Sequence, residues 1–164
     1  MLRKAALSAV ILAASFAPAA GRDSLGIYGK WGAFRDPAVP RCYAIAKAEP
    51  TARQRTYQPF AAIGSWPRRG ARGQVYLRLS RALGPAPRAV LVIAGQQLAL
   101  TGAGADAWSP DQRTDAAILA AMRSAAGMTV RARDERGRVF FDTYDLTGAP
   151  TALDAATLGC ARLR

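Results

Sequence analysis

The sequence predicts a mainly β fold, either an antiparallel β sandwich or a partly closed barrel, with one medium helix and a short C-terminal helix. The clearest strand is 74–80, where Val75, Leu77 and Leu79 alternate with polar or aromatic residues, as on a strand with one buried face. Short apolar segments separated by proline- or glycine-containing turns fill most of the first two thirds of the chain. Helical spacing of apolar residues is found only at 109–127 and near the end of the chain, so helices are expected to be the minor component.

The first 19 residues have the layout of a secretory signal peptide. Arg3 and Lys4 precede an apolar run at 5–14, and Ala17 and Ala19 supply the small residues of a cleavage site. The chain is therefore expected to comprise a signal peptide at 1–19, an N-terminal linker at 20–27 and a single β-rich domain at 28–164. Later apolar runs are shorter than the roughly 18 residues of a membrane-spanning helix, so we expect a periplasmic or secreted domain without a transmembrane segment.

Strands are expected in order along this domain. The segments 30–35 and 41–47 form a first hairpin around the proline-containing turn 36–40, and strands follow at 60–65 and 74–80. The apolar run 89–94 and the segment 98–101 are expected to form a second hairpin. The glycine-rich segment 101–108 lacks the spacing and the lysine of a phosphate-binding loop and is expected to be a connection.

A third hairpin is expected around the turn 134–137, where Gly137 suits a glycine bulge. In its second strand the inward residues are either Val139 and Phe141 or their neighbours, since the pattern leaves the register open. In its first strand, three residues are expected to face inward: Met128, Val130 and Ala132.

Two helices complete the prediction. Ser109 is the expected N-cap of the first helix, with Pro110 at its first position and Gly127 at its end. Thr147 is the expected N-cap of the short second helix, which Gly159 is expected to end. The apolar face of the first helix is expected to pack on the sheet, and Gly159 is expected to turn Cys160 back toward it.

The only two cysteines, Cys42 and Cys160, lie near opposite ends of the expected domain. In an oxidising compartment they are most simply a disulfide, which would close a loop of more than 100 residues. In the chain-entropy model such a loop stabilises the fold by about 4 to 5 kcal/mol. An intermolecular pair and a reactive thiol are the alternatives, but no CxxC motif or histidine is present to lower the pKa of a thiol.

Several motifs of the sequence resemble a known family. They are W-G-A-F at 31–34 leading to R-C-Y at 41–43, the segments G-M-T-V-R-A-R-D at 127–134 and G-R-V-F-F-D-T-Y-D-L-T-G at 137–148, and the closing helix. With these motifs the chain resembles a divergent member of the invasion-associated locus B family of exported alphaproteobacterial proteins, over residues 28–160. Trp31, Cys42, Gly148 and Cys160 carry most of the resemblance, while Ala149 replaces the usual phenylalanine and an additional central cysteine pair is missing. The resemblance implies a small β-rich protein of the cell envelope, in some members linked to host-cell invasion, and it implies no catalytic residues.

The residue types argue against catalysis. The absence of histidine excludes histidine-based catalytic triads and the commonest zinc and copper ligand sets, and no cofactor is expected. The acidic residues are scattered, and two pairs, Asp142 with Asp145 and Asp134 with Glu135, lie beside arginines and are expected to form surface ion pairs. A hydrolase that uses two carboxylates remains as a less favoured alternative.

The formal net charge of +12 favours anionic partners. Arginine guanidinium groups bind phosphate or carboxylate oxygens in pairs, and neighbouring aromatic rings can stack on a ligand. The residues of the candidate anion-binding site come from the loops on either side of the 60–65 strand: Arg53, Arg55, Tyr57, Trp66, Arg68, Arg69 and Arg72. Because a strand separates the two loops, these residues are expected to form two clusters unless the chain folds back.

From these observations we expect a non-enzymatic exported protein of the cell envelope that binds an anionic surface or an envelope or host protein, and not a specific nucleic acid. The alternative is a purely structural periplasmic domain, with solvated arginine loops and with Trp66 in the core.

Overall fold

In the computed structural model, residues 21–85 and 88–161 are described. They form one antiparallel sheet of ten strands that stays open, together with two helices and a short 3₁₀ turn, so the expected mainly β fold is confirmed. The strands are β1 (Asp23–Tyr28), β2 (Trp31–Asp36), β3 (Arg41–Lys47), β4 (Phe60–Trp66), β5 (Ala71–Arg78), β6 (Ala89–Ile93), β7 (Gln96–Ala103), β8 (Asp106–Trp108), β9 (Gly127–Arg133) and β10 (Val139–Asp145). The 3₁₀ turn η1 is Pro67–Arg69, and the helices are α1 (Gln112–Met122) and α2 (Ala149–Cys160).

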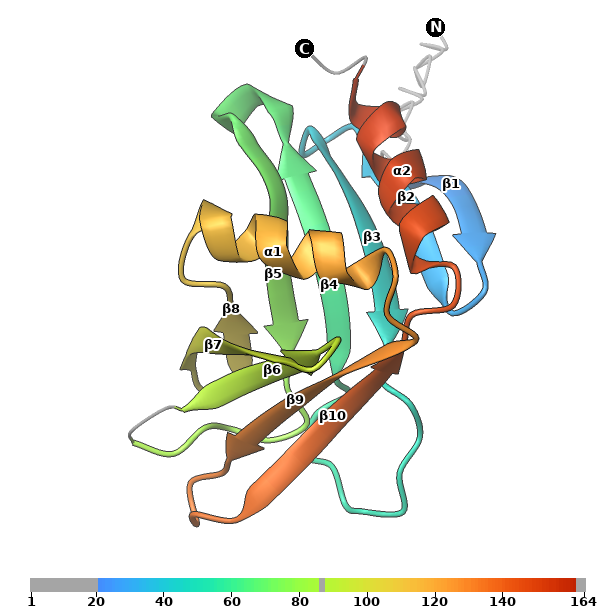
Figure 1. Ribbon diagram of the computed structural model, residues 1–164. Helices are drawn as coiled ribbons and strands as arrows, with labels where there is room; N and C mark the ends of the chain where they lie inside the picture. Colours follow the sequence, from blue (N-terminus) through green and yellow to red (C-terminus); the bar gives the residue numbers. More distant parts are fainter. Residues whose placement is uncertain (1–20, 86–87, 162–164) are drawn as a thin grey trace, which may run out of the picture.

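The sheet folds over to give a sandwich-like arrangement. Its strand order is β1-β2-β3-β4-β5-β8-β7-β6-β9-β10, so the first five strands form a meander and the remaining five follow it in a rearranged order. In Figure 1, β6, β9 and β10 cross the lower end of the meander, while α1 and α2 lie on one of its faces. The core is therefore enclosed by the meander, the two helices and the second group of strands.

Alternation of side chains builds this core. In β5, Val75 and Leu77 are buried, and Leu79 just after the strand is fully buried, as the sequence pattern predicts. Met128, Val130 and Ala132 of β9 also face inward as expected. In β10 the open register resolves to the neighbours of Val139 and Phe141, because the buried residues of that strand are Phe140, Asp142 and Tyr144.

Two segments contain strands where none was expected. Asp23–Tyr28, most of which lies in the expected linker, forms the edge strand β1 and pairs with β2. The expected connection 101–108 contains the end of β7 and all of β8, which pair around the turn at Gly104. Both are short or glycine-containing strands, so the local pattern is weak and pairing with a neighbour decides the structure.

The helix boundaries differ from the expected ones. The N-cap of α1 is Asp111, whose Oδ1 accepts the Thr114 amide at 2.7 Å, and the Ser109 hydroxyl instead donates to the buried carboxylate of Asp115. The N-cap of α2 is Gly148 rather than Thr147. Gly159 lies within α2 and does not end it. A Cβ at this position would overlap the Leu25 side chain of β1. Close packing of α2 on the sheet therefore accounts for that glycine.

Three contacts join the segment before α2 to the first hairpin. The Lys30 amide donates to the Thr147 carbonyl at 3.0 Å, and Trp31 Nε1, in a fully buried ring, donates to the Asp145 carbonyl at 2.9 Å. Gly148 has φ +86°, and a Cβ on it would overlap the Tyr28 carbonyl oxygen. The chain after β10 is thus held against the β1–β2 turn.

The two edges of the open sheet are β1 and β10. The ladder between β1 and β2 is irregular between Ser24 and Gly26. Along β10, the Glu49 amide of the loop after β3 donates to the Thr143 carbonyl at 2.7 Å.

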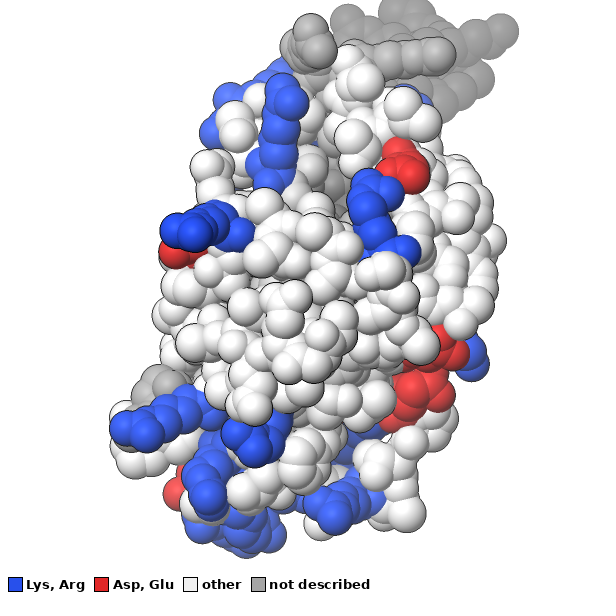
Figure 2. Space-filling view, in the orientation of Figure 1, with Lys and Arg blue, Asp and Glu red and all other residues white. Residues whose placement is uncertain are grey.

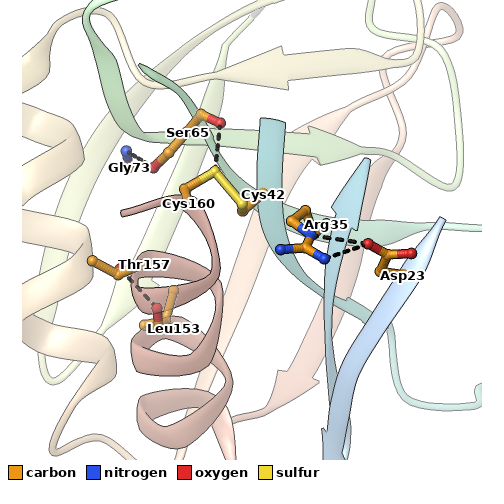
Figure 3. The surroundings of a disulfide bond; sticks show 8 residues. All are labelled: Asp23, Arg35, Cys42, Ser65, Gly73, Leu153, Thr157 and Cys160. Carbon is orange, nitrogen blue, oxygen red and sulfur yellow. Dashed lines mark hydrogen bonds and ion pairs between the residues drawn. A yellow bond between two sulfur atoms is a disulfide. The ribbon is translucent and has the colours of Figure 1, made fainter. Parts of the chain in front are cut away.

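The expected disulfide joins Cys42 of β3 to Cys160 at the end of α2, with a Cα–Cα distance of 5.6 Å (Figure 3). Both cysteines are buried, so the bond lies under the last turn of α2. No helix within the described ranges is long and apolar enough to cross a membrane.

Candidate anion-binding site

The β4–β5 hairpin presents three of the seven candidate residues at its tip. Pro67 begins the 3₁₀ turn η1, and Gly70, with φ +66°, closes it by donating its amide to the Pro67 carbonyl at 3.1 Å. This turn exposes the hairpin-tip arginines, Arg68, Arg69 and Arg72. Within the described part of the chain, none of the three forms an ion pair.

All ion pairs among the described residues use other arginines. The arginines that contact a carboxylate within 4 Å are Arg35, Arg41, Arg78, Arg81, Arg123 and Arg138. The hairpin-tip arginines thus keep their full charge and hydrogen-bonding capacity available to a ligand.

The loop between β3 and β4 holds Arg53, Arg55 and Tyr57 at the opposite end of β4 (Figure 1). Arg55 is half-buried and donates from Nη2 to the Glu49 carbonyl at 2.6 Å, so it stabilises its own loop. The Arg78 guanidinium lies 4.6 Å from the centroid of the Tyr57 ring. The candidate residues therefore form two separate clusters, and two members of the second cluster have partners within the protein.

Trp66 lies at the end of β4. The sequence left open whether its side chain belongs to a binding loop or to the core. It is half-buried, and a Cβ on Gly64 would lie 2.7 Å from its ring carbons, so the ring rests on the glycine backbone. Alternation along β4 places Trp66 on the face of the sheet away from the helices, whereas Ala61 and Ile63 face the core. Trp66 is therefore neither a core residue nor part of the hairpin-tip arginines.

A groove of about 900 Å³ separates α1, α2 and the β4–β5 hairpin. Its walls include Leu119 and Leu153, Cys160 lies at one end, and Arg68, Arg72 and Arg123 line it. Arg123 contacts Asp154 of α2 at 2.8 Å in an exposed ion pair. Figure 2 shows this side of the molecule, where basic side chains surround a largely uncharged surface and acidic side chains are few.

Two of the expected surface carboxylates are buried instead. Asp134 accepts hydrogen bonds from the amides of Arg136 and Arg138 and contacts the side chains of Arg81 and Arg138. Burial raises the pKa of Asp134, but these hydrogen bonds outweigh burial and lower the pKa to about 2. Asp134 thus organises the β9–β10 turn from inside the fold.

Asp142 is fully buried and forms no ion pair with any described residue. Its Oδ2 accepts the Ser80 amide at 2.8 Å, and burial raises the pKa of this carboxyl. The expected surface ion pairing of Asp142 with neighbouring arginines is wrong, because successive residues of a strand alternate and Asp142 lies on the inner face of β10. Asp145 instead accepts the Thr147 amide at 2.7 Å.

Asp115 has a structural role between α1 and the sheet. Its Oδ1 accepts the Val75 amide at 2.8 Å and the Ser109 hydroxyl. β8 pairs with β5 at Tyr76, Leu77 and Arg78 but not at Val75. The Asp115 carboxylate therefore accepts the Val75 amide in place of a neighbouring strand. No group of three or more potential metal ligands of the types His, Cys, Asp and Glu occurs among the residues that the structure describes.

A second groove, which the sequence does not predict, lies on the face of the sheet away from the helices. It has a volume of about 540 Å³, and five aromatic side chains of β3, β4, β5 and β8 contribute to its lining. Alternation along β3 places Tyr43 and Ile45 on one face, but only the pairing of β5 with β8 shows which other rings join them.

Comparisons of the chain with protein-family models, curated proteins and solved structures found no match.

Proposed function

We propose that this chain is a non-enzymatic exported protein of the cell envelope that binds a phosphate-bearing anionic surface through Arg68, Arg69 and Arg72. The observation that carries the proposal is the exposure of three arginines without ion pairs at one hairpin tip. The intramolecular disulfide supports an oxidising compartment such as the periplasm or the exterior. The signal-peptide layout and the resemblance to the invasion-associated locus B family support the same location.

The expected binding energy is modest and additive. An arginine near an anionic membrane surface contributes about 1 kcal/mol at physiological salt. Three such residues on one tip contribute about 3 kcal/mol, which corresponds to roughly a hundredfold in affinity. Their bidentate geometry suits phosphate oxygens, which both phosphatidylglycerol and lipopolysaccharide present.

Vesicle co-sedimentation tests the proposal. We expect retention on phosphatidylglycerol-containing vesicles but not on pure phosphatidylcholine, and a steep loss between about 50 mM and 500 mM salt. The triple variant Arg68→Gln, Arg69→Gln and Arg72→Gln should bind roughly a hundredfold more weakly. Lipopolysaccharide aggregates in a parallel arm distinguish the two sources of phosphate.

A second triple variant controls for net charge. Arg131→Gln, Arg133→Gln and Arg136→Gln remove the same charge from exposed positions on and beside β9. This variant should retain most of the binding. An equal loss in both variants would show that only net charge matters, and equal retention in both would favour the purely structural alternative, in which charge serves solubility.

A further inference from the structure

The second groove follows the length of β4. Tyr43 and Ile45 of β3 pair with Gly64 and Ala62 of β4. Across the other side of β4, the same two small residues pair with Gln74 and Tyr76 of β5, and Tyr76 pairs with Trp108 of β8. The small residues of the central strand thus form a low floor between two higher walls.

Aromatic rings bound this floor at both ends. Trp66 lies over Gly64 at one end. Phe60 lies at the other, with its ring 5.7 Å from that of Tyr76. Four residue steps separate Phe60 from Gly64, over which the Trp66 ring lies, so the open floor is about 13 Å long at roughly 3.3 Å per step. Its volume of about 540 Å³ is that of a pocket for one small ligand.

The Trp66 end of the groove is positively charged. Arg22 and Arg41 both line the groove, and Arg22 is exposed. Arg41 makes one contact of 3.3 Å with Asp36 and lies over the Tyr43 ring, 5.1 Å from its centroid. Arg22 forms no ion pair with any other described residue.

Few polar groups along the floor are available to a ligand. The Tyr76 hydroxyl donates to Asp106 at 2.6 Å, and Asp115 Oδ1 already accepts the Val75 amide and the Ser109 hydroxyl. A polyhydroxylated saccharide would leave most of its hydroxyl groups unpaired over the Trp66 ring and Ala62, which costs free energy. An unbranched hydrocarbon chain has no such cost and fits a narrow apolar floor.

We propose that this groove binds a single-chain amphipathic anion, with its carboxylate or phosphate head at Arg22 and Arg41 and its acyl chain running from the Trp66 ring along Ala62 toward Phe60. The site is separate from the hairpin-tip arginines and does not depend on them. Charge complementarity at one end and the apolar length of the remainder select this ligand class.

Tryptophan fluorescence provides the test, because Trp66 and Trp108 line the groove while Trp31 is buried in the core. The probes are laurate and laurate brominated at the end of its chain, both below their critical micelle concentrations. We expect saturable binding, with quenching of the groove tryptophans by the brominated probe. Acetate, which lacks the chain, and dodecyltrimethylammonium, which has the opposite charge, should not bind comparably.

Variants assign the site. Ala62→Leu fills the floor and should weaken laurate binding by roughly tenfold or more. Ala99→Leu adds the same side chain at an exposed position of β7 and should leave binding unchanged. Arg22→Gln should weaken binding by about threefold. The triple variant of Arg68, Arg69 and Arg72 should bind laurate as the unaltered protein does, which separates this proposal from the proposed function.

Several results would overturn the proposal. One is the absence of saturable laurate binding, and another is equal binding of dodecyltrimethylammonium. Equal effects of Ala62→Leu and Ala99→Leu would place the ligand elsewhere. A change of oligomeric state in Ala62→Leu, measured by sedimentation velocity, would assign the groove to a second copy of the chain.

Discussion

Two buried carboxylates, Asp134 and Asp142, have effects on stability of opposite sign. A carboxyl group has a pKa of about 3.9 in an unfolded chain. Asp134 has a lower pKa in the fold, so its contribution is present above about pH 4 and is lost as the pH falls toward about 2. Burial raises the pKa of Asp142, so its contribution is present below about pH 4 and is lost as the pH rises through its folded-state pKa.

Asp134→Asn should therefore lower stability at neutral pH and have progressively less effect in acid. The substituted amide cannot accept the same charge-assisted hydrogen bonds from Arg81 and Arg138. Urea unfolding at pH 7, 4 and 2.5 measures this, with the difference from the unaltered protein shrinking between about pH 4 and 2.

Asp154→Asn is the matched control, because it removes an acid from an exposed pair with Arg123. Its effect should be small at every pH, since solvent screens exposed ion pairs. A constant difference between Asp134→Asn and the unaltered protein across the whole pH range would contradict the assignment.

At the scale of elements, the fold depends on how α2 packs against the meander of β1 to β5. The segment before α2 contacts the β1–β2 turn through Lys30, Trp31 and Gly148, and α2 then crosses the meander as far as Cys42. Trp31, Cys42, Gly148 and Cys160 all take part in this docking. Of these four residues only Cys160 lines a groove. Their contacts therefore indicate a structural role.

Gly148→Ala should destabilise the fold by roughly 3 kcal/mol or more, because strain at φ +86° adds to overlap with the Tyr28 carbonyl. Gly70→Ala is the control, since Gly70 has φ +66° and open space around it. It should cost only the backbone strain of about 1 to 2 kcal/mol. Urea unfolding measures both variants, and equal costs would show that the contact with Tyr28 relaxes freely.

At the scale of the whole molecule, one covalent bond connects the meander to the last helix. Cys42 and Cys160 are 118 residues apart in the sequence. A loop of that length restricts the unfolded chain strongly, whereas its length has little effect on the folded chain.

Reduction of the disulfide should lower the free energy of unfolding by about 5 kcal/mol in the chain-entropy model. The double variant Cys42→Ala and Cys160→Ala should show a similar loss and should not respond to reductant. Urea unfolding with and without reductant measures both. A loss below about 1 kcal/mol would show that the reduced unfolded chain is already compact.

How far the sequence predicts this structure depends on whether the deciding contact is local. The alternation in 74–80 and the pairing of the only two cysteines were sufficient for β5 and for the disulfide. Ser109 and Asp111 are both good N-caps, and only the contact of Ser109 with Asp115 shows why the helix begins after Asp111. That contact is made within the fold and has no separate signal in the sequence.

The position of Asp142 could not be predicted for a related reason. Phe140 and Phe141 are adjacent and identical, so either can face the core, and a shift of one residue exchanges the two faces of a strand. For the candidate anion-binding site, the sequence predicted two separate clusters of arginines because a strand lies between the two loops. The aromatic groove required the non-local pairing of β5 with β8.

The open sheet leaves two borders at which another polypeptide could add a strand and start a filament. The irregular ladder between Ser24 and Gly26 distorts one border, and the amide of Glu49 occupies the carbonyl of Thr143 on the other. The loop after β3 therefore covers part of the β10 edge, where another strand could otherwise add. Loss of the Glu49 hydrogen bond would expose this part of the β10 backbone to a neighbouring molecule.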